Sequence, residues 1–217
     1  MSTIDLLSAV SGGLATAKTL GYSTASAAHD VYEAYVLTLL LRAAKRQGWT
    51  WDLRDTSGKI TTDAIFRMAP GRLPSGNFTH VLLSKAGNSD LEAHIGIKVV
   101  GNSNVRHEYD LLVLSASTAK TCRALNEDPA HSDVVAHAEA KYYNSNLTLP
   151  LGRAYLGLAA DCNLPGKSVL VTNQNGRTVE ELSIFYGLDF RFLIKPSNTI
   201  GEYHLIRCFE KFLISAP

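Results

Sequence analysis

The chain has 217 residues, of which 46% are hydrophobic, and its formal net charge is +1 at neutral pH. This length and hydrophobic content suffice for one substantial core, so a single domain is expected. The near-neutral charge argues against a protein that coats nucleic acid through a strongly basic surface.

The cysteines and the N-terminal segment narrow the class of protein further. Cys122, Cys162 and Cys208 are odd in number, widely spaced and outside any Cys-x-x-Cys or Cys/His pattern, so neither a disulfide framework nor a zinc site is expected. The apolar N-terminal stretch is interrupted by Asp5, has no basic region before it and is too short to span a membrane. We therefore expect a cytoplasmic protein without a membrane segment.

Helical patterns dominate the first part of the chain. Residues 3–20 are expected to form a short helix, and a stronger helical pattern extends over 26–47, with Gly48 as its stop. On this basis we divide the chain into an N-terminal helical appendage, residues 1–25, and one main domain, residues 26–217.

Glu33 occupies an unusual position in the second of these helices. Its helical spacing places this carboxylate on the apolar face that should meet the core. An alternative is a carboxylate that reaches solvent or pairs with Arg42. The apolar residues on that face are Val36, Leu37, Leu40 and Ala44.

The remainder of the chain alternates between strand and helix patterns. A polar segment, 49–77, contains many turn residues around a short helix or strand near 63–68. The expected strands are 80–85, 91–100, 105–114, 134–143, 167–172 and 190–194, and the expected helices are 117–127, 149–160 and 178–186. This order predicts an α/β fold, with a mixed central sheet flanked by helices on both faces.

Charged residues interrupt two of the apolar strands. Asp110 begins the apolar run 111–114, and Glu139 and Lys141, two positions apart in the next expected strand, share one face of the sheet. Burying unpaired charge costs several kcal/mol, so these charges should be compensated. A hard divalent cation such as Mg²⁺, which prefers carboxylate, water and phosphate oxygens, would compensate them.

At these residues the chain resembles the PD-(D/E)xK, or restriction-endonuclease-like, superfamily. The signature of that superfamily is an acid followed later by a second acid, one further residue and a lysine, and Asp110 and Glu139-Ala140-Lys141 match it. No proline precedes Asp110, and Glu139 follows Asp110 by 29 positions, a long gap that we attribute to an inserted helix at 117–127. The resemblance covers residues 26–195 by order of elements and implies a restriction-endonuclease-like fold.

The resemblance also implies an activity. Many members carry a glutamate on the first core helix that completes the metal site, and Glu33 occupies the matching place. The implied activity is that of a Mg²⁺-dependent endonuclease acting on DNA rather than RNA, with Mn²⁺ as a substitute cation. Asp110, Glu139 and Glu33 would be the metal ligands, and Lys141 would be the catalytic lysine.

The biological role rests on analogy, and other functions stay open. Because one such site cuts one strand, a homodimer or a subunit of a larger defence complex is expected, with a role in restriction or anti-phage defence. One alternative is a structure-selective nuclease of the Holliday-junction-resolvase kind. A second is a non-catalytic binding or assembly module with the same fold. A third is an internal ion-pair network that needs no ligand.

Overall fold

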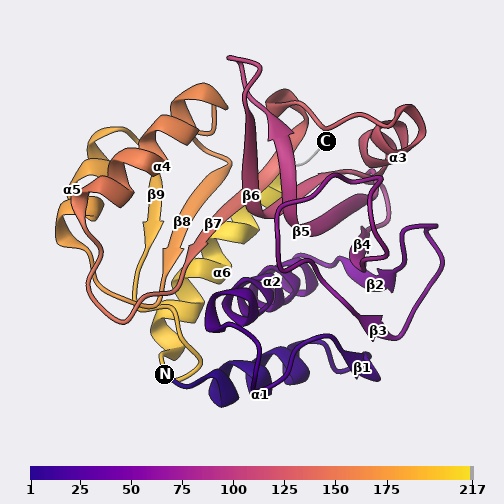
Figure 1. Ribbon diagram of the computed structural model, residues 1–217, viewed down its shortest axis with the longest axis horizontal. Coiled ribbons are helices and arrows are strands. Elements are labelled where there is room, and N and C mark those ends of the chain that lie inside the picture. The colour runs from indigo at the N-terminus through magenta and orange to yellow at the C-terminus, as the bar shows by residue number, and fades with distance from the viewer. Residues whose placement is uncertain (216–217) are drawn as a thin grey trace.

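The computed structural model describes residues 1–215, so the last two positions of the predicted domain 26–217 lie outside the described residues. Figure 1 shows the arrangement of the elements. In chain order they are α1 (Thr3–Gly13), β1 (Thr19–Leu20), α2 (Ala28–Arg46), β2 (Thr50–Arg54), β3 (Asp63–Ala64), β4 (His80–Ser84), β5 (Leu91–Val100), β6 (Arg106–Ser115), α3 (Ala116–Leu125), the 3₁₀ helix η1 (His131–Asp133), β7 (Val134–Lys141), α4 (Leu149–Asp161), β8 (Ser168–Thr172), α5 (Arg177–Phe185), β9 (Asp189–Arg191) and α6 (Thr199–Ile214).

A seven-stranded sheet forms the centre of the molecule, in the order β2-β4-β5-β6-β7-β8-β9. The strands from β2 to β7 pair antiparallel, whereas β7, β8 and β9 pair parallel. β6 and β7 are direct neighbours, with Leu111 opposite Ala138 and Leu112 opposite His137. The helix α3 between them in sequence therefore leaves the antiparallel meander intact.

Helices cover both faces of the sheet, as the sequence predicts (Figure 1). α2 and α6 pack on one face, where alanine and valine side chains such as Ala138 and Val171 leave room for them, and α1 packs against the outer side of α2. α3, α4 and α5 pack on the other face, over Leu112 and Leu170. Within residues 1–215, none of the helices combines the length and the apolar character needed to cross a bilayer.

α2 is the central helix, and 13 of its 19 residues are buried because it lies between the sheet, α1 and α6. Asp30 in its first turn and Lys45 and Arg46 in its last turn complement the helix dipole. Gly48, with φ +82°, adopts the left-handed conformation that ends the helix and redirects the chain into β2. This position makes α2 the element that presents Glu33 toward the strands.

The N-terminal segment differs from the expected single helix 3–20. α1 ends at Gly13, and a Cβ on that glycine would lie 2.5 Å from the Cβ of Thr38, so only glycine permits this close approach of α1 to α2. The chain then forms β1, which pairs parallel with β3. Leu6 and Val10 of α1 belong to the core beneath the sheet, so residues 1–25 pack against the main body of the chain.

Candidate active site

Three of the predicted site residues meet where β6 and β7 run side by side. The carboxylate of Asp110 accepts hydrogen bonds from the backbone N–H of Ala140, at 2.8 Å, and from Lys141 Nζ, at 3.0 Å. Lys141 Nζ also lies 2.8 Å from Glu139 Oε1. The ammonium group therefore bridges the two carboxylates.

A local irregularity of the sheet makes room for Asp110. Leu111 and Tyr109, on either side of it, pair with β5, but Asp110 itself does not. The facing residue on β5 is Gly96, whose φ of +64° is a left-handed conformation that favours glycine. On the other side, the N–H of Ala140 bonds to the Asp110 carboxylate. Asp110 thus occupies a break in the ladder while remaining buried.

The three charges influence one another strongly. Burial and the negative charge of Glu139 raise the pKa of Asp110 above its ordinary value. Burial also works against the ionisation of Glu139, but the neighbouring His137 and Lys141 outweigh it and lower the pKa of this carboxyl to about 2. Burial alone would lower the pKa of Lys141, whereas Glu139 and Asp110 raise it. Lys141 is therefore a charged lysine that holds an ionised Glu139.

Two further carboxylates, Glu33 and Glu108, face the same charges. Burial and the negative charge of Asp110 raise the pKa of Glu33 to about 9. Burial and Asp110 also raise the pKa of Glu108, which lies two positions before Asp110 on β6. Repulsion among these carboxyl groups therefore raises the pKa of both Glu33 and Glu108, and Glu33 is protonated at neutral pH. A cation bound beside them would relieve this repulsion.

The predicted auxiliary residue Glu33 is near the site but not in direct contact with it. Among residues 1–215 its carboxylate has no hydrogen-bond or ion-pair partner, and Arg42, the alternative partner, instead contacts Glu202 of α6 at 2.7 Å. The carboxylates of Glu33, Asp110 and Glu139 do not bring three ligand atoms within 4.8 Å of one another in the described part of the chain. The site as it stands is a two-carboxylate site with acidic neighbours.

A series of buried polar side chains extends from α4 through β8 to Glu139. The hydroxyl of Tyr155 on α4 lies 2.7 Å from Ser168 Oγ, which in turn lies 2.8 Å from His137 Nδ1. The other ring nitrogen, His137 Nε2, lies 3.5 Å from Glu139 Oε2. This distance is longer than an ordinary hydrogen bond, and both atoms lack a hydrogen-bond partner among the described residues.

The donor set fits a hard divalent cation. Glu139 Oε2 is a buried oxygen without a hydrogen-bond partner in the described chain, and the carboxylates of Asp110 and Glu139 are joined only through Lys141. Mg²⁺ commonly takes one or two protein carboxylates and completes its shell with water and phosphate oxygens. Asp110 and Glu139 would supply this number of ligands.

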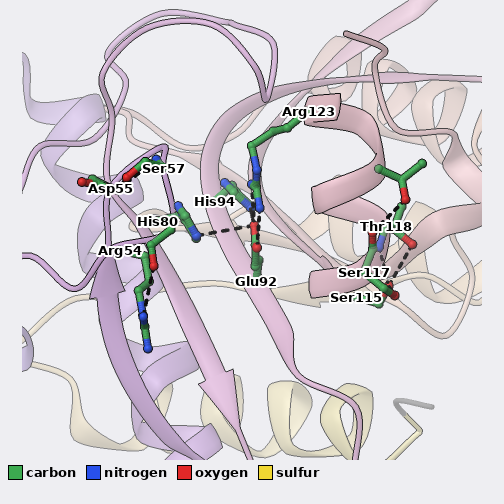
Figure 2. Close-up of polar contacts among 12 residues, drawn as sticks. Arg54, Asp55, Ser57, His80, Glu92, His94, Ser115, Ser117, Thr118 and Arg123 are labelled. Carbon is green, nitrogen blue, oxygen red and sulfur yellow. Dashed lines mark hydrogen bonds and ion pairs between the residues drawn. The ribbon is translucent and has the colours of Figure 1, made fainter. Parts of the chain in front are cut away.

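Sequence reasoning missed a second polar cluster, made by His80 on β4, Glu92 and His94 on β5, and Arg123 on α3 (Figure 2). Burial opposes the ionisation of Glu92, but hydrogen bonds from Arg123 and His94 lower the pKa of this carboxyl to about 2. Burial and the neighbouring His94 lower the pKa of His80 to about 4. The available signal was the spacing of Glu92 and His94, two positions apart in an apolar strand.

Comparison of the chain with known protein families, with curated proteins and with solved structures finds no match.

Proposed function

We propose that this chain is a Mg²⁺-dependent phosphodiesterase that cuts DNA. Asp110 and Glu139 are the cation ligands, Lys141 is the catalytic lysine, and Glu33 is an auxiliary carboxylate. The observation that carries the proposal is the bridge of Lys141 Nζ between two carboxylates on adjacent strands, at 3.0 and 2.8 Å. Such an acid-acid-lysine group combines cation ligands with a hydrogen-bond donor for phosphate or water.

Each residue has a definite task in this proposal. When bound, a divalent cation would neutralise phosphate charge and acidify a water molecule. Asp110 is held by the N–H of Ala140 and keeps its carboxylate oriented, while Glu139 offers the buried Oε2. The ammonium of Lys141, already aligned by both carboxylates, donates to the attacking water or to a non-bridging phosphate oxygen as negative charge develops there.

The wider parts of the proposal follow from the resemblance to restriction-endonuclease-like proteins. They are DNA as the substrate, Mn²⁺ as a substitute for Mg²⁺, the restriction-endonuclease-like form of the fold, and a role in restriction or anti-phage defence. They also include a homodimer or a larger complex, because one site cuts one strand. The repulsion among the carboxyl groups near Lys141, which raises the pKa of Glu33 and Glu108, supports the cation requirement, whereas these wider parts depend on analogy.

Nicking of supercoiled plasmid in the presence of Mg²⁺ tests this proposal. We expect Asp110→Asn and Lys141→Ala to lower the nicking rate by about 100-fold or more, because each removes a group that acts on the reacting phosphate. Asp63→Asn and Lys120→Ala are matched controls, since both residues are exposed and, within residues 1–215, neither contacts the site residues. These controls should cut as fast as the unaltered chain.

The same assay separates the alternatives. Faster cleavage of a four-way junction than of linear duplex at equal concentration would favour a structure-selective nuclease. Faster cleavage of RNA than of DNA would identify RNA as the substrate. Equal residual activity in the unaltered chain, Asp110→Asn and Lys141→Ala would refute the catalytic proposal. In that case, Mg²⁺ titration followed by thermal unfolding distinguishes a cation-binding module, whose stability rises with Mg²⁺, from an internal ion-pair network, whose stability does not.

A further inference from the structure

Two histidines and a glutamate converge on one point beside the sheet, outside the site built on Asp110. His80 comes from β4, and Glu92 and His94 come from β5 (Figure 2). All three are buried, and one ligand atom from each lies within 4.8 Å of the others. Both imidazole Nε2 atoms point at the same carboxylate oxygen, Glu92 Oε2. This convergence distinguishes the group from histidines that merely fill a core.

The separations of the two imidazole nitrogens from the carboxylate oxygen are close to those between ligands of one metal ion. His94 Nε2 lies 2.9 Å and His80 Nε2 lies 3.5 Å from Glu92 Oε2. Zinc–ligand bonds of about 2.0–2.2 Å place neighbouring ligand atoms of a tetrahedral site roughly 3.3–3.6 Å apart. An ion would therefore require His94 and Glu92 to separate by roughly half an ångström, and the two imidazole rings, which are stacked with their planes 18° apart, to turn toward it.

A small cavity adjoins the cluster. Its volume is about 20 Å³, and His80, His94 and Arg123 are among the residues that line it. A polar cavity of roughly 10–15 Å³ suffices for one water molecule, so this space accommodates one small ligand beside the histidines. Three protein ligands with one water-sized position beside them are typical of zinc sites that keep an open coordination position.

Arg123 of α3 holds the carboxylate in place. Its guanidinium donates to both oxygens of Glu92, at 2.8 Å to Oε2 and 2.7 Å to Oε1. Groups that orient a ligating carboxylate from outside are a regular part of metal sites. The competing explanation is that Arg123 alone neutralises Glu92, and the histidines only complete a buried ion-pair network.

We propose that His80, Glu92 and His94 bind a transition-metal ion of the zinc class through the two Nε2 atoms and Glu92 Oε2. Two imidazoles and one carboxylate are ligands that zinc accepts, whereas Mg²⁺ favours oxygen alone. His94 then carries its proton on Nδ1, because Nε2 must be free of a proton to bind the ion. Arg123 keeps its hydrogen bond to Glu92 Oε1.

This site is separate from the one proposed for phosphodiester hydrolysis. His94 faces Leu112 on β6, and Leu112 faces His137 on β7, so one strand lies between the two clusters. Neighbouring strands are about 4.8 Å apart, which places the backbones of His94 and His137 roughly 10 Å apart. The two sites can therefore be tested independently on the same chain.

Metal retention by the full chain tests the inference. The purified chain is stripped with chelator, equilibrated with Zn²⁺, dialysed at neutral pH and analysed for bound metal. We expect one zinc ion per chain, and with Co²⁺ a visible absorption spectrum of a low-coordinate site. His94→Ala should lose both signals, and so should Glu92→Gln, which keeps the size of the side chain. His204→Ala, at an exposed histidine, and Asp110→Asn should retain both signals.

Zinc content of the unaltered chain well below one ion per chain would overturn the inference and leave Arg123 as the sole counter-charge of Glu92. A cobalt spectrum that persists in both His94→Ala and Glu92→Gln would overturn it as well. Because the first of these results is read on the unaltered chain, a folding defect in a variant does not rescue the inference. Loss of nicking activity in Asp110→Asn with full zinc retention would support the two sites separately.

Discussion

Burial and the charges of the candidate site raise the pKa of Glu33 far above its ordinary value. Its carboxyl pKa of about 9 means that it carries a proton at neutral pH in the folded chain, whereas its ordinary pKa is 4.5. The cause is burial, reinforced by the negative charge of Asp110. Between pH 4.5 and about 9, the folded chain thus binds one proton more than the unfolded chain.

This difference predicts how stability depends on pH in the absence of divalent cations. The contribution of Glu33 is complete below its ordinary pKa of 4.5 and is lost as the pH rises toward about 9. The free energy of unfolding should fall by up to about 1.4 kcal/mol per pH unit from this group alone. Glu33→Gln cannot ionise, so it should become more stable relative to the unaltered chain as the pH rises.

Urea denaturation in chelator at about pH 5.5 and about pH 8.5 measures this dependence. Glu127→Gln, at an exposed glutamate, is the control and should follow the unaltered chain at both pH values. A Glu33→Gln chain whose relative stability is the same at both pH values would show that Glu33 is ionised in the folded protein.

Residue patterns predicted part of the candidate site. Alternation along a strand predicted that Glu139 and Lys141 share a face, and in the structure Lys141 Nζ lies 2.8 Å from Glu139 Oε1. The contact of Asp110 with Ala140 could not be predicted, because it depends on the left-handed Gly96 and the break in the ladder. The same alternation places His137 on the face of Glu139, but its contact with Ser168 could not be predicted, because Ser168 lies on a different strand.

At the scale of elements, α6 is the main feature that the sequence analysis did not assign. Its apolar residues have helical spacing, but the buried acids Glu202 and Glu210 interrupt them. Those acids are acceptable because Arg42 and Arg46 of α2 contact them at 2.7 and 2.9 Å. The apolar residues that α6 buries are Leu205, Ile206, Phe209, Phe212 and Leu213.

The strands that were expected are present, with ends that coincide or differ by up to three residues. β2 was not expected because its residues are polar and partly exposed, with only Leu53 buried, as suits an edge strand. The short helix or strand expected near 63–68 is the two-residue strand β3, whereas β1, also of two residues, was not expected because it is too short for any periodicity to be detected. Long apolar elements were therefore predictable, whereas short edge elements depend on tertiary pairing.

The packing of α6 predicts a difference between two phenylalanines. Phe209 on α6 is 1% exposed and lies in the core beneath the sheet, whereas Phe185 at the end of α5 is 81% exposed. We expect Phe209→Ala to lower the free energy of unfolding by about 3–5 kcal/mol, since it leaves a cavity. Phe185→Ala should change it by less than about 0.5 kcal/mol.

Urea denaturation of both variants, under identical conditions, measures the two changes. Similar losses in Phe209→Ala and Phe185→Ala would mean that α6 does not pack as described or that Phe185 is covered in solution by another molecule. Sedimentation velocity distinguishes these explanations, because covering of Phe185 by a second chain would appear as association.

At the scale of the whole molecule, the proposed function predicts how cleavage products depend on protein concentration. A single site cuts one strand, so isolated chains should convert supercoiled plasmid to relaxed circles. Paired chains should give linear plasmid, because two sites then act on opposite strands. We expect the ratio of linear to relaxed product to rise over the concentration range in which sedimentation velocity detects association.

Gel analysis of plasmid products at several protein concentrations, together with sedimentation velocity, checks this expectation. A chain that sediments as a monomer throughout, yet gives a constant proportion of linear plasmid, would contradict the dimer. That result would leave the phosphodiesterase proposal itself intact, since the Asp110→Asn comparison tests it separately.

The helix α3 lies between β6 and β7 in sequence but does not part them in space. The distance along the chain from Asp110 to Glu139 is therefore independent of the distance between their side chains. Insertions and deletions in this connection could accumulate during evolution while the two acids stay side by side. For proteins in which a helix connects the two acidic strands, the sequence spacing of the acids is a poor indicator of evolutionary relationship. The pairing of the two strands is a better indicator.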